Sequence, residues 1–150
     1  PIVLYSEFTK FLGLSEEYPI IKVGTTAMLE ALQVVFPAER YGVKPVAYFS
    51  ELPEDAGTIV GGIEVRHLTD IPRIDRGMGI DVALVACSPG WVQITLDLLS
   101  GAGVTGVLLL TPIIRVRRPE GMNVTQMRMP CDLKSLACRC RVPLGTVGTM

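Results

Sequence analysis

The chain has 150 residues and a mass of 16.3 kDa, which is the size of one compact domain over residues 1–150. Hydrophobic residues make up 49% of it, charged residues 19%, and its mean hydropathy is +0.41, which excludes an intrinsically disordered chain. The net charge of -1 and the pI near 5.9 do not fit a domain that binds DNA directly through its own surface.

Targeting and redox signals are weak. No apolar run approaches the roughly 18 residues that span a bilayer, and the first residues, PIVLYSEF, lack the charged start and cleavage site of a signal peptide. We therefore expect a cytoplasmic protein without membrane contact. Three cysteines lie close together near one end, unlike a disulfide framework, which predicts reduced thiols. The cysteines are Cys87, Cys131, Cys138 and Cys140.

The N-terminal third alternates helical and extended patterns. Apolar residues at near-helical spacing predict a helix over 6–18, with Ser6 as its cap and Pro19 just after its end. An apolar run then predicts a buried strand over 20–24, and a second helix is expected over 25–36. The apolar stripe of that helix consists of Met28, Leu29, Leu32 and Val35.

The middle of the chain contains two further strand patterns. The first covers 43–49, where Pro45 cannot donate a hydrogen bond and so indicates a bulge or an unpaired position. Gly61 and Gly62 interrupt the chain before a short strand over 63–68. The segment LTDIPRI then begins a short connecting helix.

The C-terminal half holds the clearest strand and helix pair, over 81–88 and 89–103, with proline in the first turn of the helix and glycines at its end. A buried strand is predicted over 104–112, followed by the basic turn RVRRPEGMNV and a sixth strand at VTQM. A final short helix is expected over 131–140, within a C-terminal helix and tail that cover 130–150, and the last ten residues look loosely ordered.

Unbroken apolar strands that alternate with helices predict an α/β fold with a doubly wound, mostly parallel sheet of the Rossmann type, with helices on both faces. Ligands of such sheets bind beyond the carboxyl ends of the strands, near the point where the strand order reverses. The site is therefore expected at residues 24–26, 49–51 and 86–91.

Segments along nearly the whole chain resemble the sensor domain of the redox-sensing transcriptional repressor Rex family, within the CoA-binding-like group of Rossmann folds. They are FLGLSEEYPIIKVG, VAYF with GGIEVRHLTDI, AGVTGVLLLTPIIRVRRPEGMNV and DLKSLACRC. The resemblance implies binding of NAD(H) and release of operator DNA when NADH binds. It also implies that residues 1–19 form a leading helix and linker after a winged helix that is absent here.

The same resemblance implies a homodimer in which the C-terminal helix is exchanged between subunits. Leu133, Leu136 and Ala137 should then be buried by the partner chain.

The phosphate-binding turn departs from the three-glycine fingerprint, because Gly24, Thr26 and Leu29 hold its three positions. The N-terminus of the following helix still offers free N–H groups, and the hydroxyls of Thr25 and Thr26 could donate to a phosphate. Alternatively, the two threonines only cap a helix in a fold that has lost its nucleotide.

The acidic residue that normally binds the ribose hydroxyls corresponds to Ser50. The neighbouring Glu51 could take its place only with a bulge, or it is a solvated loop carboxylate. Trp91 stacks on a ligand ring or packs the helix onto the sheet. The full set of expected ligand-contacting residues is Gly24, Thr25, Thr26, Phe49, Ser50, Glu51, Cys87, Ser88, Pro89, Trp91, Thr111 and Pro112.

The remaining clusters of cysteine, histidine and arginine residues give weaker evidence for a site. A zinc site needs four ligands, and the single histidine, His67, is far in sequence from the C-terminal cysteines, which leaves plain thiols or a redox-active pair at Cys138 and Cys140. The arginines at 115, 117 and 118 form a solvated loop or touch a phosphate or a partner. No catalytic motif appears, so we do not expect an enzyme. The alternatives to an NAD(H) sensor are another adenine nucleotide, a CoA ligand, or a dimerisation module without a ligand.

Overall fold

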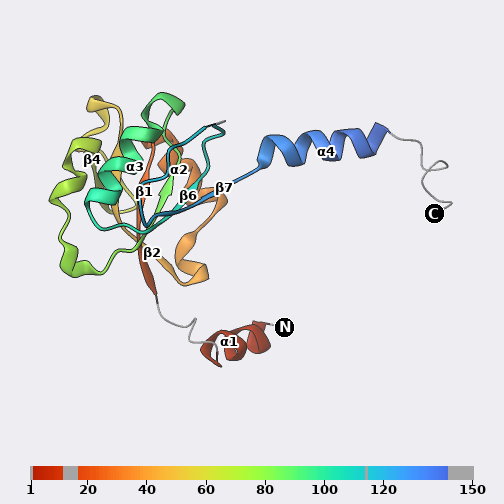
Figure 1. Ribbon diagram of the computed structural model, residues 1–150. Helices are drawn as coiled ribbons and strands as arrows, with labels where there is room; N and C mark the ends of the chain where they lie inside the picture. Colours follow the sequence, from red (N-terminus) through yellow and green to blue (C-terminus); the bar gives the residue numbers. More distant parts are fainter. Residues whose placement is uncertain (1, 12–16, 114, 142–150) are drawn as a thin grey trace.

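The computed structural model describes residues 2–11, 17–113 and 115–141. A seven-stranded sheet forms its centre, in the order β3-β4-β2-β1-β5-β6-β7 (Figure 1). Every neighbouring pair is parallel except β3 and β4, which form an antiparallel hairpin at one edge. The predicted doubly wound parallel sheet is therefore confirmed.

The strands and α-helices have the following bounds. The strands are β1 Tyr18–Val23, β2 Val43–Ser50, β3 Ile59–Val60, β4 Ile63–His67, β5 Val82–Val85, β6 Gly106–Leu109 and β7 Asn123–Gln126. The helices are α1 Ile2–Phe11, α2 Thr26–Val35, α3 Val92–Gly101 and α4 Met129–Arg141. Short 3₁₀ turns are η1 Ala38–Tyr41, η2 Pro53–Asp55, η3 Leu68–Arg73, η4 Arg76–Met78 and η5 Pro89–Trp91.

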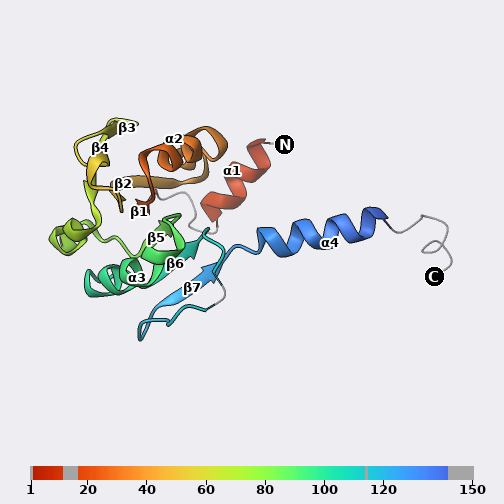
Figure 2. The same ribbon diagram turned by 90° about the horizontal axis from the view of Figure 1, so that it is seen from above.

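The two faces of the sheet are covered by different helices, as Figure 2 shows for α2 and α3. On the α3 face, a large apolar cluster joins the sheet to α3 and η3, with Phe49, Val85 and Leu96 at its centre. On the α2 face, a smaller cluster joins Leu29 to three residues of the sheet, Tyr48, Val60 and Val65. Alternate residues of β2 therefore serve opposite cores, with Phe49 in one and Tyr48 in the other, which explains why this strand reads as an unbroken apolar run.

Two local features of the sheet follow from single residues. Ile20 pairs with Pro45 but Ile21 pairs with Ala47, so β2 carries one extra residue beside the proline, which confirms the predicted bulge. Gly61 and Gly62 have φ values of +55° and +82° and form the tight turn between β3 and β4. Only the very short strand β3 was not predicted.

The predicted N-terminal helix is present, but its predicted bounds and cap were wrong. α1 begins at Ile2 and ends at Phe11, so Ser6 does not cap it, and both Tyr18 and Pro19 belong to β1. Parallel pairing of Tyr18 with Val43 outweighs the weak helical spacing of this segment. Residues 12–16 lie outside the described residues.

The predicted stripe of the second helix was correct only in part. Thr25 caps α2, but Leu29 is its one fully buried residue, whereas Met28 is 41% exposed and Val35 is 80% exposed. The strands predicted over 81–88 and 104–112 end early, at Val85 and Leu109. Beyond these strand ends Cys87 and Thr111 are still buried, whereas Ser88 and Pro112 are exposed.

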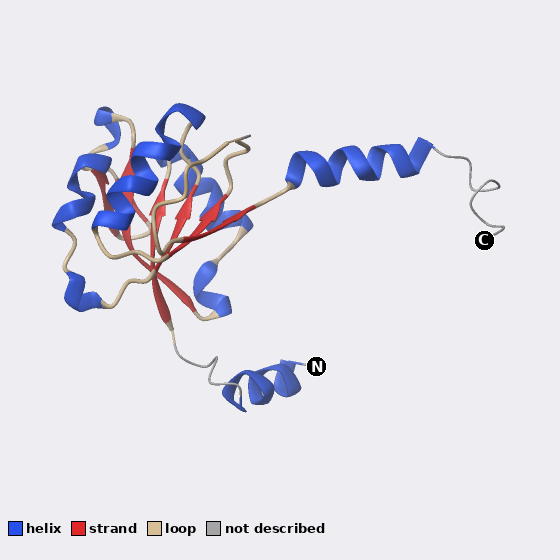
Figure 3. Cartoon of the chain, in the orientation of Figure 1, coloured by secondary structure: helices blue, strands red, loops and turns tan. Residues whose placement is uncertain are grey.

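The C-terminal helix extends away from the body of the molecule (Figures 1 and 3). α4 contains the predicted segment 131–140, and all of its residues are exposed. The tail over 142–150 lies outside the described residues. Among the described helices, none is long and apolar enough to cross a membrane.

The core on the α2 face yields a matched pair of variants. Leu29→Ala should lower the free energy of unfolding by roughly 2–5 kcal/mol, because it leaves a cavity between α2 and the sheet. Val35→Ala, on the same helix, should change it by less than about 0.5 kcal/mol because its side chain is exposed. Urea unfolding of both variants measures the difference, and equal losses would contradict this packing of α2.

Candidate functional site

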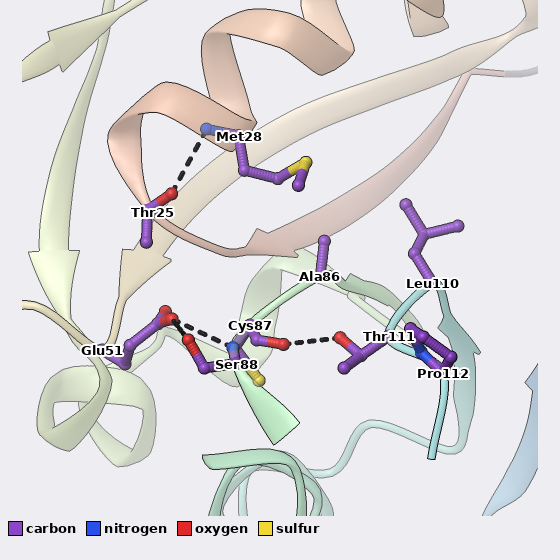
Figure 4. A pocket seen from close by; sticks show the side chains of 9 residues that line it. All are labelled: Thr25, Met28, Glu51, Ala86, Cys87, Ser88, Leu110, Thr111 and Pro112. Atoms are coloured by element: carbon purple, nitrogen blue, oxygen red, sulfur yellow. Dashed lines mark hydrogen bonds between the residues drawn. The ribbon is translucent and has the colours of Figure 1, made fainter. Parts of the chain in front are cut away.

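The loops that follow β1, β2, β5 and β6 meet at one end of the sheet (Figure 4). β1 lies at the reversal of strand order, with β2 on one side and β5 on the other. A cavity of about 310 Å³ opens there, which we call the switch-point cavity. Its lining residues are Thr25, Met28, Glu51, Ala86, Cys87, Ser88, Leu110, Thr111 and Pro112.

The cavity gathers part of the predicted set. Thr25, Glu51, Cys87, Ser88, Thr111 and Pro112 line it, whereas Gly24, Thr26, Phe49, Ser50, Pro89 and Trp91 do not. Ala86 begins the expected range 86–91, whereas the sequence reasoning missed Met28 and Leu110, which are apolar residues of elements already expected at the site. Nothing except their place beside the strand ends distinguished them from core residues.

The first turn of α2 is closely fitted to the strand beside it. Thr25 Oγ1 accepts a hydrogen bond from Met28 N at 3.3 Å and so caps the helix. A Cβ atom at Gly24 would lie 3.4 Å from the Ala86 carbonyl oxygen and from Met28 Cγ. The remaining glycine of the fingerprint therefore serves close packing between the turn and β5.

Asp55 brings a carboxylate next to Ser50, the residue at which an acidic side chain was expected, although Asp55 does not itself line the switch-point cavity. Its Oδ2 accepts hydrogen bonds from the Thr26 backbone N–H at 2.9 Å and from the Ser50 hydroxyl at 2.6 Å. The 3₁₀ turn η2 brings Asp55 back to the end of β2. Partial burial raises the pKa of Asp55, but the hydrogen bonds from Ser50 and Thr26 outweigh it and lower the pKa below the ordinary value.

Sequence reasoning missed Asp55 because it lies in a loop beyond the aligned position. The acidic loop SELPEDAG was the available signal, but the direction of its carboxylates depends on the turn at Pro53.

Glu51 bridges the ends of β2 and β5. Its side chain is buried, with the residue 2% exposed, and its Oε1 accepts hydrogen bonds from Ser88 N at 3.0 Å and from Ser88 Oγ at 2.8 Å. The interpretation of Glu51 as a solvated loop carboxylate was therefore wrong. Because this residue follows directly on a buried strand end, its side chain turns inward.

Two buried polar atoms near this cavity have no hydrogen-bond partner. Over the described part of the chain, Thr26 Oγ1 and Glu51 Oε2 are the buried side-chain oxygen and nitrogen atoms in this state. Leaving such atoms unpaired in a folded protein costs about 1–3 kcal/mol each. One can donate or accept a hydrogen bond and the other can accept one, so together they suit a ligand rich in hydroxyl or amide groups.

Cys87 is held in place by hydrogen bonds, and its thiol has low reactivity. Burial raises the pKa of its thiol to about 11, and Thr95 Oγ1 lies 3.6 Å from its sulfur. The Thr111 hydroxyl donates to the Cys87 carbonyl oxygen at 2.5 Å and joins the ends of β5 and β6. At neutral pH the thiol is protonated, so it does not act as a nucleophile or a metal ligand.

The aromatic candidates lie outside the cavity. Phe49 is fully buried in the core, with the Arg66 guanidinium 4.9 Å from its ring centre. Trp91 is 37% exposed and is not part of either core cluster. The packing role that the sequence offered is therefore not seen in the core clusters, and the stacking of Trp91 on a ligand ring stays a prediction. Among the described residues, no group of three or more His, Cys, Asp or Glu side chains is placed to hold a metal ion.

Cysteine labelling tests this arrangement. Iodoacetamide at pH 8 should modify the exposed Cys131 readily and leave Cys87 unmodified, because Cys87 is buried and its thiol pKa is raised. In urea, both should react. Mass spectrometry of the labelled peptides measures the ratio, and equal labelling of Cys87 and Cys131 in the folded protein would contradict the assignment.

Comparisons with known proteins agree with the fold. No protein-family model matches the chain. Two solved structures of RSP, a Rex-family repressor, match it: the complex with beta-NADH has a TM-score of 0.77 and the complex with beta-NAD+ and operator DNA a TM-score of 0.78. Both are 23% identical and cover 91% of this chain, with 66% and 63% of their own chains covered. At this identity, the match establishes the fold.

A curated relative is closer in sequence. The redox-sensing transcriptional repressor Rex of Streptomyces griseus is 31% identical over 134 residues, which are 89% of this chain and 53% of the relative. The Rex protein of Streptomyces avermitilis is 29% identical over the same share of each chain. The chain thus spans about half the length of these relatives. Its sequence match and its sheet agree, and the chain is homologous to about half of the Rex-family repressor of Streptomyces griseus.

Proposed function

We propose that this chain is the sensor module of a redox-responsive transcription regulator and that its switch-point cavity binds NAD(H). The relatives are described as redox-sensing repressors, and RSP has been solved with beta-NADH and with beta-NAD+. The observation that carries the proposal is the pair of unpartnered polar atoms, Thr26 Oγ1 and Glu51 Oε2, beside a cavity at the reversal of strand order.

Asp55 is the residue that we assign to the ribose. An acidic side chain at the end of the second strand of such sheets accepts hydrogen bonds from ribose hydroxyls. Asp55 Oδ2 is held by Thr26 and Ser50, which orients the carboxylate and leaves Oδ1 without a described hydrogen bond. The carboxylate also disfavours a ribose that carries a 2′-phosphate, because like charges repel.

The turn before α2 supplies weaker phosphate binding than a glycine-rich turn. Thr26 stands where the second glycine would be, and its backbone N–H is already bonded to Asp55. Leu29 stands at the third and packs against Tyr48, Val60 and Val65. We therefore expect modest affinity, with a CoA ligand or a different adenine nucleotide as the alternative.

The role in transcription belongs to a longer protein. The matched relatives are about twice the length of the matched segment, and the net charge of this chain does not favour direct DNA binding. The module would act in the cytoplasm as a regulator and not as an enzyme, by changing the geometry of a dimer when the nucleotide binds.

The dimer is a second part of the proposal, and α4 supports it. Met129, Leu133 and Leu136 follow one another at helical spacing and are 58%, 61% and 52% exposed. Such a stripe on a projecting helix is stabilised when another surface covers it. We propose that a second copy of this chain buries Leu133, Leu136 and Ala137, in keeping with the resemblance to a family that exchanges this helix.

The ligand is tested by calorimetric titration with NADH, NAD⁺, ATP and CoA. Asp55→Ala should weaken NADH binding roughly 10- to 100-fold, because hydrogen bonds to a charged group contribute about 1.5–3 kcal/mol. Glu54→Ala removes an exposed neighbouring carboxylate and should leave the affinity unchanged. If the unmodified protein bound none of the four ligands, the result would instead favour a dimerisation module without a ligand.

Sedimentation velocity tests the dimer. The double variant Leu133→Asp, Leu136→Asp should sediment as a monomer where the unmodified protein is a dimer, because it places charge in the apolar stripe. Lys134→Glu alters an exposed residue of the same helix and should remain dimeric. A strict monomer of the unmodified protein at high concentration would rule out this interface.

A further inference from the structure

The arginines of the basic turn after β6 differ in whether their charge is paired with a residue of α3. Arg117 Nη2 forms an ion pair with Asp97 Oδ2 at 3.2 Å, and its backbone N–H donates to Gln93 Oε1 at 3.0 Å. Arg117 therefore holds the turn onto α3, and its charge is balanced. The neighbouring Arg115 and Arg118 form no ion pair with any residue in the described part of the chain.

Arg118 lines two adjoining cavities, and Arg115 lines one of them. One, of about 410 Å³, is lined by Arg115, Arg118 and Gln126 together with apolar residues. The other, of about 560 Å³, shares Arg118 and Gln126 and adds Arg128, which follows β7. Arg128 also lacks an ion pair within the described residues. No aspartate or glutamate lines either cavity.

Gln126 holds together the two segments that line these cavities. Its Nε2 donates to the Ile113 carbonyl oxygen at 2.8 Å and so ties the loop after β6 to the end of β7. The loop and the strand are thereby held on either side of the cavity of about 560 Å³, with Arg118 on the loop and Arg128 beyond the strand.

Arg118 shares one cavity with Arg115 and the adjoining one with Arg128, and none of the three has an ion-pair partner among the described residues. Their mutual repulsion is relieved when an anion lies between them. Guanidinium groups bind phosphate in a bidentate manner through their planar fork of donors. We propose that Arg118 and Arg128, supported by Arg115, bind a phosphate group of a small phosphorylated molecule.

The position relates this anion site to the switch-point cavity. Pro112 lines both the switch-point cavity and the cavity that contains Arg128. The phosphate can therefore belong to a molecule that extends from the switch-point cavity, which rests on the proposed function, or to a separate small molecule. In either case the positive charge for a phosphate lies beyond β6 and β7, whereas the N-terminus of α2 is partly occupied by Asp55.

Inorganic pyrophosphate is the probe for the anion site. Calorimetry at constant ionic strength should show saturable binding, and the double variant Arg118→Gln, Arg128→Gln should bind at least roughly 10-fold more weakly. Arg40→Gln is the matched control, because Arg40 is exposed on η1, which precedes β2 at the opposite end of the sheet. It should bind as the unmodified protein does. Thermal unfolding of each variant verifies its fold.

Two results would overturn the anion site. One is the lack of saturable pyrophosphate binding by the unmodified protein, and the other is equal affinity in the double variant. NADH titrations of the same variants separate this proposal from the previous one. Weaker NADH binding in the double variant would mean that the phosphate belongs to the ligand of the switch-point cavity. Unchanged NADH binding would mean that it belongs to a separate molecule. Pyrophosphate binding without any NADH binding would refute only the dinucleotide proposal.

Discussion

Parallel pairing of β1 with both β2 and β5 is the constraint from which the rest of the structure follows. It aligns the carboxyl ends of neighbouring strands, and hydrogen bonds continue the pairing beyond them. Gly24 N donates to the Phe49 carbonyl oxygen at 2.9 Å, and Ala86 N donates to that of Val23 at 2.7 Å. The loops that build the cavity therefore start from fixed positions, although they come from distant parts of the sequence.

The sheet was predictable because its requirements are local. A strand buried on both faces needs an unbroken apolar run, and a proline inside such a run needs a bulge, so the pattern around Pro45 indicated both features. The boundary of α1 was not predictable from spacing alone, because it depends on where β1 finds its partner. Thr25 and Gly24 were identified for the same local reason as the strands, since a turn and a helix start leave short-range signals.

The acidic part of the site could not be predicted in the same way. Ser50 stands at the aligned position, but the carboxylate is supplied by Asp55, which reaches it only through the 3₁₀ turn after Pro53. Solvent exposure was one of two interpretations of Glu51 because loop carboxylates are usually exposed, yet its partner Ser88 follows a strand that is distant in sequence. Long-range hydrogen bonds of this kind are fixed by tertiary structure and leave no periodic signal.

Arg128 lies between β7 and α4 and belongs to neither element. The residue before it, Met127, donates its N–H to the Leu109 carbonyl oxygen and extends the pairing of β7 with β6. The Arg128 carbonyl oxygen itself accepts the first hydrogen bond of α4, from Asp132 N at 2.9 Å. A change in the direction of α4 at its first turn would therefore move the backbone of Arg128 and with it the guanidinium group. If α4 joins two copies of the chain and the arginines bind a phosphate, as proposed, the two events would be energetically linked, and by reciprocity each would alter the equilibrium of the other.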